Sequence, residues 1–203
     1  SMASGFAVGP MLNSNFKNGR DVEARNLLWV LQVAFFIGTF LFSLWSKEIF
    51  FFLIQNDVLR ETYPLAIIIV MSYNYRPMYL GANAKLFFVE KTNVLWRVTF
   101  VAGVLNVFLN LVFIPLYGII VAAVTTFICY MYMGYVGFFL DAHKLNNSVR
   151  YYPLAWLCGT IGLTALVYAL VEIHPIFKLF VTFTVALIGL GFYKKFQTEL
   201  NRS

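Results

Sequence analysis

The sequence predicts an all-α integral membrane protein with about six transmembrane helices. Hydrophobic residues make up 61% of the 203 residues and charged residues 12%, whereas soluble proteins average about 45–50% and about 25%. A soluble domain of this size cannot hide so much apolar surface, because a large share of a small domain stays exposed. The composition therefore excludes an ordinary soluble domain and intrinsic disorder.

Six apolar segments are each close to the roughly 20 residues that cross a bilayer as a helix. They occupy residues 27–46, 64–83, 94–114, 117–140, 152–171 and 175–193. A further apolar run at 49–54 either extends the first span or lies at the membrane interface. We therefore expect a six-helix transmembrane bundle over residues 27–193, followed by a cytoplasmic tail at 194–203.

The first 26 residues do not contain a full span. Residues 2–12 are mildly apolar but too short to cross a bilayer. They are typical either of the last turns of a helix whose beginning is missing or of a short interfacial segment. We favour the first alternative, in which residues 1–26 are the truncated end of a preceding helix plus a charged cytoplasmic loop.

Prolines mark the ends of the predicted spans, with one exception. Pro64, Pro153 and Pro175 stand at span starts, where a missing N–H costs little. Pro115 is expected in the tight turn between the third and fourth spans. Pro77 alone lies within a span and predicts a kink or local opening of that helix.

The lysines and arginines predict the orientation. Eleven lie on the side that carries both ends of the chain, namely Lys17, Arg20, Arg25, Lys85, Lys91, Arg97, Lys144, Arg150, Lys194, Lys195 and Arg202. Three lie on the other side, namely Lys47, Arg60 and Lys178. Because cytoplasmic loops are enriched in Lys and Arg, both ends are predicted to be cytoplasmic. The net charge of +6 is thus explained by topology and anionic-lipid contacts, and we expect no nucleic-acid partner.

The sequence offers no catalytic, metal or cofactor site. The two histidines, His143 and His174, fall in predicted loops on opposite sides, so no Ser/His/Asp set forms from them. No metal-type cluster and no P-loop pattern is present. The acidic residues lie outside the spans or at their edges, which disfavours a carboxylate-driven proton antiporter. We therefore expect no enzymatic activity and no cofactor.

Arg76 is the fifteenth basic residue and lies inside the second span. It follows Pro64 by 12 residues, about 18 Å of helix at 1.5 Å per residue. A charge at mid-span costs at least roughly 2.5–3.5 kcal/mol and usually faces a wet cavity or a partner. Guanidinium binds phosphate well, and aromatic rings suit sugar faces. One interpretation is therefore that Arg76 binds an anionic ligand, with or without attached sugars, in a central cavity. The alternative is a structural arginine bonded to helix carbonyls or to a carboxylate in a missing segment.

Five further residues complete the predicted substrate path. Tyr73, Asn74 and Tyr79 surround Arg76 in a span that is unusually polar. Asn106 and Asn110 lie four residues apart on one face of the third span. These two amides either line the same cavity or hydrogen-bond to a neighbouring helix, and the second alternative is favoured on physical grounds alone.

A series of motifs resembles the C-terminal half of the polysaccharide flippases in the multidrug/oligosaccharidyl-lipid/polysaccharide exporter superfamily. The series begins with Gly-Arg-Asp-Val-Glu-Ala-Arg at 19–25 and continues with a tyrosine-rich span. It then shows Asn-x3-Asn at 106–110, Ile-Pro-Leu-Tyr-Gly-Ile at 114–119, Ala-Ala at 122–123 and Thr-Thr at 125–126. Val121 stands where the family pattern favours Gly. The resemblance covers most of residues 6–140.

The resemblance implies a function, a location and a partner. Such proteins flip polyprenyl-diphosphate-linked oligosaccharides across the bacterial inner membrane for surface polysaccharide biosynthesis, and they have a cationic cavity between two lobes. The six-helix bundle would then be one helical lobe of a two-lobed transporter, and its partner would be an N-terminal lobe of the same protein. Two other hypotheses are a drug or cation exporter of the same superfamily and a membrane enzyme that acts on lipid-linked glycans.

Overall fold

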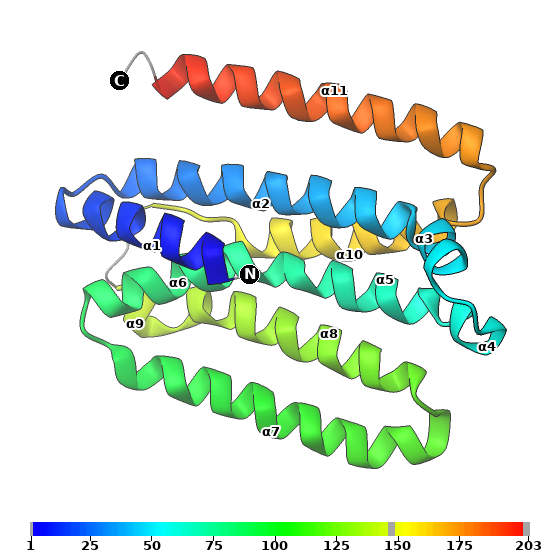
Figure 1. Ribbon diagram of the computed structural model, residues 1–203. Coiled ribbons are helices and arrows are strands. Elements are labelled where there is room, and N and C mark those ends of the chain that lie inside the picture. The colour runs from blue at the N-terminus through cyan, green and yellow to red at the C-terminus, as the bar shows by residue number, and fades with distance from the viewer. Residues whose placement is uncertain (1, 146–148, 201–203) are drawn as a thin grey trace.

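The computed structural model describes residues 2–145 and 149–200, without the side chains of residues 2–7, 193 and 195–200, and every regular element in these ranges is helical. Long helices lie side by side, and each crosses the bundle in the direction opposite to that of the long segment before it in the chain, with α7 and α11 at opposite edges (Figure 1). Five helices are long and apolar enough to cross a membrane, which makes this an all-α membrane protein. They are α2 (Asp21–Leu44), α7 (Thr92–Tyr117), α8 (Ile120–Tyr135) with the 3₁₀ turn η2 (Val136–Phe139), α10 (Pro153–Leu170) and α11 (Pro175–Leu200).

The second predicted span, residues 64–83, is not a single α-helix. It consists of α5 (Tyr63–Ser72), the 3₁₀ turn η1 (Tyr73–Tyr75) and α6 (Arg76–Phe88). Because Pro77 has no N–H, the Tyr73 carbonyl loses its usual partner four residues ahead. The Arg76 N–H donates to that carbonyl instead, which tightens the turn to 3₁₀ geometry. Pro77 therefore interrupts the α-helix as predicted, but through a tightened 3₁₀ turn and not through a local opening.

Several predicted boundaries need correction. α7 continues through Pro115 to Tyr117, and the turn itself lies at Gly118 with φ +76°. The run at 49–54 mostly lies in a separate helix, α3 (Ser46–Leu53). α11 continues to Leu200, because no Gly or Pro follows Gly191, so most of the predicted tail at 194–203 is helical. Arg202 and the side chain of Lys195 lie outside the described residues.

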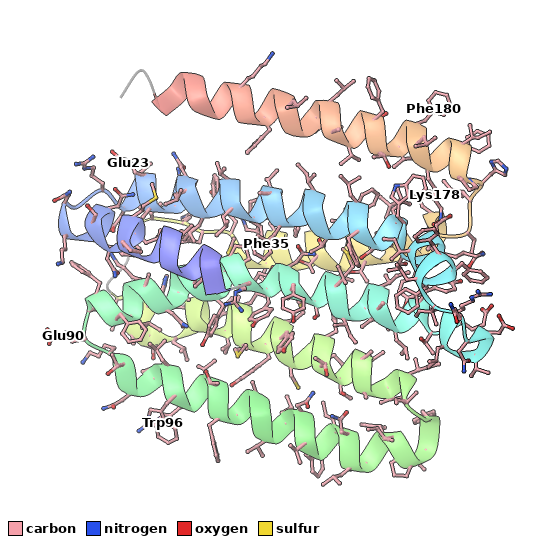
Figure 2. All side chains as sticks on the ribbon, in the orientation of Figure 1. Glu23, Phe35, Glu90, Trp96, Lys178 and Phe180 are labelled. Carbon is pink, nitrogen blue, oxygen red and sulfur yellow. The ribbon has the colours of Figure 1, made fainter. Side chains whose placement is uncertain are left out.

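Short helices complete the chain at both ends of the bundle. α1 (Met2–Lys17) packs against α2 and α6, α4 (Asp57–Arg60) follows α3, and α9 (Asp141–Lys144) follows η2. We call the end that holds the start of α2, the α6–α7 connection and α9 the basic end. Glu23 and Glu90 mark it in Figure 2, and Lys178 lies at the opposite end. The two sets of loops that were predicted to lie on opposite sides of the membrane therefore lie at opposite ends of the bundle.

The buried core is concentrated around α2. One cluster of buried apolar side chains joins α1, α2, α6 and α8, and includes Leu28, Met78 and Tyr135. A second joins α2, α5 and α10, and includes Ile67 and Val167. By contrast, α7 and α11 expose most of their apolar side chains. Such exposure suits helices whose outer faces meet lipid or further helices.

Gly134 of α8 allows a close approach of the backbone at the broken span. A Cβ at Gly134 would lie 2.8 Å from both the carbonyl oxygen and the Cβ of Tyr75. We expect Gly134→Ala to destabilise the protein by about 1–3 kcal/mol through overpacking. Gly162→Ala, at a position with open space, should leave stability unchanged or raise it by up to about 1 kcal/mol. Thermal unfolding in one detergent compares the two, and equal melting temperatures would contradict the prediction.

Candidate functional site

Arg76 lies at the middle of the broken span. It is the first residue of α6, thirteen residues after Tyr63 and twelve before Phe88. The side chain is half-buried, and its Nε atom has no hydrogen-bond partner. None of the ion pairs among the described residues includes Arg76. A half-buried guanidinium that lacks a carboxylate partner is a candidate binding group for an external anion.

Tyrosine rings form a wall beside Arg76. Tyr75 stacks on Tyr130 of α8 with ring centroids 4.6 Å apart, and Tyr79 lies 5.9 Å from Tyr75. Tyr73 lies 6.3 Å from Tyr130 and is 39% exposed. The structure thus brings Tyr73, Tyr79 and Arg76 into one region, as the sequence predicts. It adds Tyr75 and Tyr130, which were not predicted as site residues because their ring contacts join different helices.

A groove of about 490 Å³ begins one turn beyond Arg76, between α6 and α7. Arg76, Tyr79 and Asn83 follow the helical spacing i, i+3, i+7 and so share one face of α6. The residues that line the groove are Tyr79, Asn83, Phe87, Leu95, Trp96, Thr99 and Phe100. Asn83 was not predicted as a site residue, although its spacing of seven residues from Arg76 places both on the same helix face. The groove offers a mostly apolar surface with a few polar groups beside a cation.

Asn74 has a structural role in this conformation. It is fully buried, and its Nδ2 donates to the Thr39 hydroxyl at 2.9 Å, while that hydroxyl lies 3.1 Å from its Oδ1. The Asn74 carbonyl accepts a hydrogen bond of 3.0 Å from Nε2 of buried Gln32. Two polar side chains of α2 therefore hold η1 in place. Direct contact of Asn74 with a ligand stays a prediction.

Asn106 and Asn110 take part in a network between α7 and α8. Asn110 Nδ2 donates to Asn106 Oδ1 at 3.1 Å, and Asn106 Nδ2 donates to the Thr126 hydroxyl at 3.4 Å. The Thr125 hydroxyl donates to Asn110 Oδ1 at 2.5 Å. These contacts match the second alternative given for the two amides, in which they hydrogen-bond to a neighbouring helix. A role of the two amides as ligand groups stays a prediction.

A second polar cluster at the basic end was missed in the sequence. Lys85 and Asp21 form an ion pair of 2.9 Å in which Lys85 is 5% exposed, and the Lys85 ammonium lies 4.8 Å above the Phe16 ring. His143 was expected in a loop, but it lies in α9 and is 2% exposed. Its ring packs against Phe138 at 4.9 Å. The apolar residues before α9 fold back over the histidine, which periodicity alone did not indicate.

His143 makes stability depend on pH. Burial, and then the charge of Lys85, lowers the pKa of His143 from 6.5 to about 4. The unfolded chain therefore binds a proton that the folded chain rejects between these values. We expect the free energy of unfolding to be highest above pH 6.5 and to fall by about 3 kcal/mol as the pH drops to 4. Chemical unfolding of the protein and of His143→Phe across this range checks this, since the variant should lack the slope.

Ion pairs join the helices at the opposite end. Lys178 of α11 is fully buried, and its ammonium donates to both carboxylate oxygens of Glu48 at 2.6 and 2.8 Å. Glu172 accepts from Lys47 and from the Tyr63 hydroxyl. Arg60 pairs with Asp57 at 2.8 Å. Each of the three basic residues predicted for this end therefore has an acidic partner, in contrast to Arg76.

No protein-family model matches this chain, and the comparisons with curated proteins and with solved structures found no match. Among the described residues, no group of three or more His, Cys, Asp or Glu side chains could hold a metal ion. Arg76 and the residues around it are therefore the candidate functional site.

Proposed function

We propose that this protein flips a polyprenyl-diphosphate-linked oligosaccharide across the bacterial inner membrane by alternating access. The observation that carries the proposal is Arg76, a half-buried cation at mid-span without a carboxylate partner among the described residues. Its guanidinium would bind the diphosphate through two parallel hydrogen bonds. The basic end would face the cytoplasm, with both chain ends on that side.

The surroundings of Arg76 suit the other parts of such a substrate. Tyr73 and Tyr79 would present ring faces to the sugars, and the groove between α6 and α7 is largely apolar and open at the bundle surface. The polyprenyl chain would stay in lipid beside this groove. Asn74, Asn106 and Asn110 are proposed as further path residues that become accessible in another conformation. A second lobe, proposed as the partner of this bundle, would supply the facing wall of the cavity.

A reconstituted flipping assay tests the proposal. The protein, expressed from its complete gene, is placed in vesicles that contain a fluorescent polyprenyl-diphosphate disaccharide, and a membrane-impermeant reductant bleaches the label on the outer leaflet. We expect the bleached fraction to exceed that of protein-free vesicles. An equal bleached fraction would contradict the proposal. Uptake of a lipophilic cationic dye without glycolipid flipping would instead support a drug or cation exporter.

A further inference from the structure

A small cavity lies at the basic end of the bundle. It has a volume of about 340 Å³, and α9, η2 and the segment that leads into α10 contribute its walls. Its lining residues are Phe138, His143, Lys144, Val149, Arg150, Tyr151, Tyr152 and Pro153. It shares no residue with the groove beside Arg76.

Two buried polar atoms at this cavity have no hydrogen-bond partner. They are Nε2 of His143, which is 2% exposed, and the hydroxyl of Tyr151, which is 3% exposed. The nearest ring to both is that of Phe138, at 4.9 and 5.2 Å between centroids. Buried polar groups are nearly always paired, so each unpaired one indicates a missing partner such as a water, an ion or a ligand. Here two such groups meet at one cavity.

The charge around the cavity favours an anion as that partner. Lys144 and Arg150 line the cavity, are exposed, and form none of the ion pairs found among the described residues. The ammonium of Lys85 also acts on His143, whereas the carboxylate of Asp21, its partner in an ion pair, acts on Tyr151. A neutral histidine with its proton on Nε2 and a tyrosine hydroxyl both donate hydrogen bonds. Two cations and two donors match the oxygen atoms of a phosphate group.

The position of the cavity suits the headgroup layer of a membrane. Tyr152, one of its lining residues, lies 6.3 Å from Trp29, and Trp29 lies 6.3 Å from Trp156. Trp and Tyr gather at the boundary between lipid tails and headgroups. The guanidinium of Arg25 lies 4.5 Å above the Trp29 ring, which adds a further cation at this level.

We infer that this cavity binds a phosphate group, with Lys144 and Arg150 as the charged ligands and Tyr151 and His143 as the hydrogen-bond donors. The phosphate belongs either to the headgroup of an anionic lipid or to a free phosphate ion. This binding site is independent of the proposed flipping function. A result that excludes phosphate binding here would leave the flipping proposal unaffected, and the reverse also holds.

Native mass spectrometry of the full chain with phosphatidylglycerol or phosphatidylcholine tests the inference. We expect phosphatidylglycerol to bind more tightly, and Tyr151→Phe to weaken that binding about tenfold, the effect of one hydrogen bond to a charged group. Since the Tyr151 hydroxyl has no partner in the unliganded protein, this variant should fold with unchanged or higher stability. The double variant Lys144→Ala/Arg150→Ala should weaken binding at least as much.

Matched controls distinguish binding at this cavity from nonspecific electrostatic attraction of anionic lipid to basic residues. Lys91→Ala/Arg97→Ala removes two basic residues near the same end that do not line the cavity, and Tyr117→Phe removes an exposed hydroxyl at the opposite end. Both should bind phosphatidylglycerol as the unchanged protein does. Equal weakening in the two double variants, or unchanged binding in Tyr151→Phe, overturns the inference. Competition by inorganic phosphate would identify the free ion as a ligand, and tight lipid binding without competition would identify the lipid headgroup.

Discussion

Arg76→Ala is expected to abolish glycolipid flipping while the protein still inserts and folds. The variant removes the guanidinium proposed to bind the diphosphate, and it breaks no ion pair among the described residues. Removal of a mid-span charge also lowers the cost of insertion, so expression should not fall. In the host, surface polysaccharide should disappear, and in vesicles the labelled glycolipid should stay on its original leaflet.

Two further variants sharpen this test. Arg76→Lys keeps the charge but loses the planar fork of donors, so flipping should be retained in part. Arg60→Ala removes an arginine that pairs with Asp57 within the short helix α4, so flipping should be unchanged. Normal polysaccharide in the Arg76→Ala strain would exclude the binding role. A large loss of thermal stability in that variant would point instead to a structural arginine.

Glu48→Ala is expected to cause the largest loss of stability, about 3–5 kcal/mol, because it leaves the buried Lys178 ammonium without its carboxylate partner. This pair connects α3 to the first turn of α11 across 130 residues of chain. Nearby, Trp45 Nε1 donates to the Thr182 hydroxyl at 3.0 Å. Since the described part of α11 is otherwise largely exposed, the variant should release this helix from the bundle.

Thermal unfolding and limited proteolysis measure this effect. The double variant Glu48→Ala/Lys178→Met should recover most of the lost stability, because an apolar side chain needs no partner. Asp57→Ala, which breaks an exposed pair with Arg60, should cost less than about 1 kcal/mol. If Glu48→Ala costs no more than Asp57→Ala, then α11 is held by its apolar contacts alone.

The sequence allowed prediction of features that depend on local patterns. Hydropathy located the spans because a helix needs about 20 apolar residues to cross a bilayer. Pro77 indicated the break in the second span because the loss of one N–H is a local effect. The mid-span position of Arg76 could be predicted in the same way, since it depends only on the distance along the chain to the two ends of the span.

Features that depend on contacts between distant segments could not be predicted. The spacing of Asn106 and Asn110 showed that they share a face, but only the fold shows that this face meets Thr125 and Thr126. Lys178 was counted as a loop charge, although Glu48 allows it to be fully buried. His143 was likewise placed in a loop, because nothing local shows which aromatic rings cover it.

The depth of Arg76 has an electrical consequence. A charge held midway along a membrane-spanning segment lies within the transmembrane electric field, where passage of one elementary charge across the whole field involves about 2.3 kcal/mol per 100 mV. Any conformational change that moves α6 along the membrane normal would therefore exchange energy with the membrane voltage in proportion to that movement. A bound diphosphate would cancel or reverse the charge that moves, so the empty and the loaded protein would respond to the same voltage in different ways.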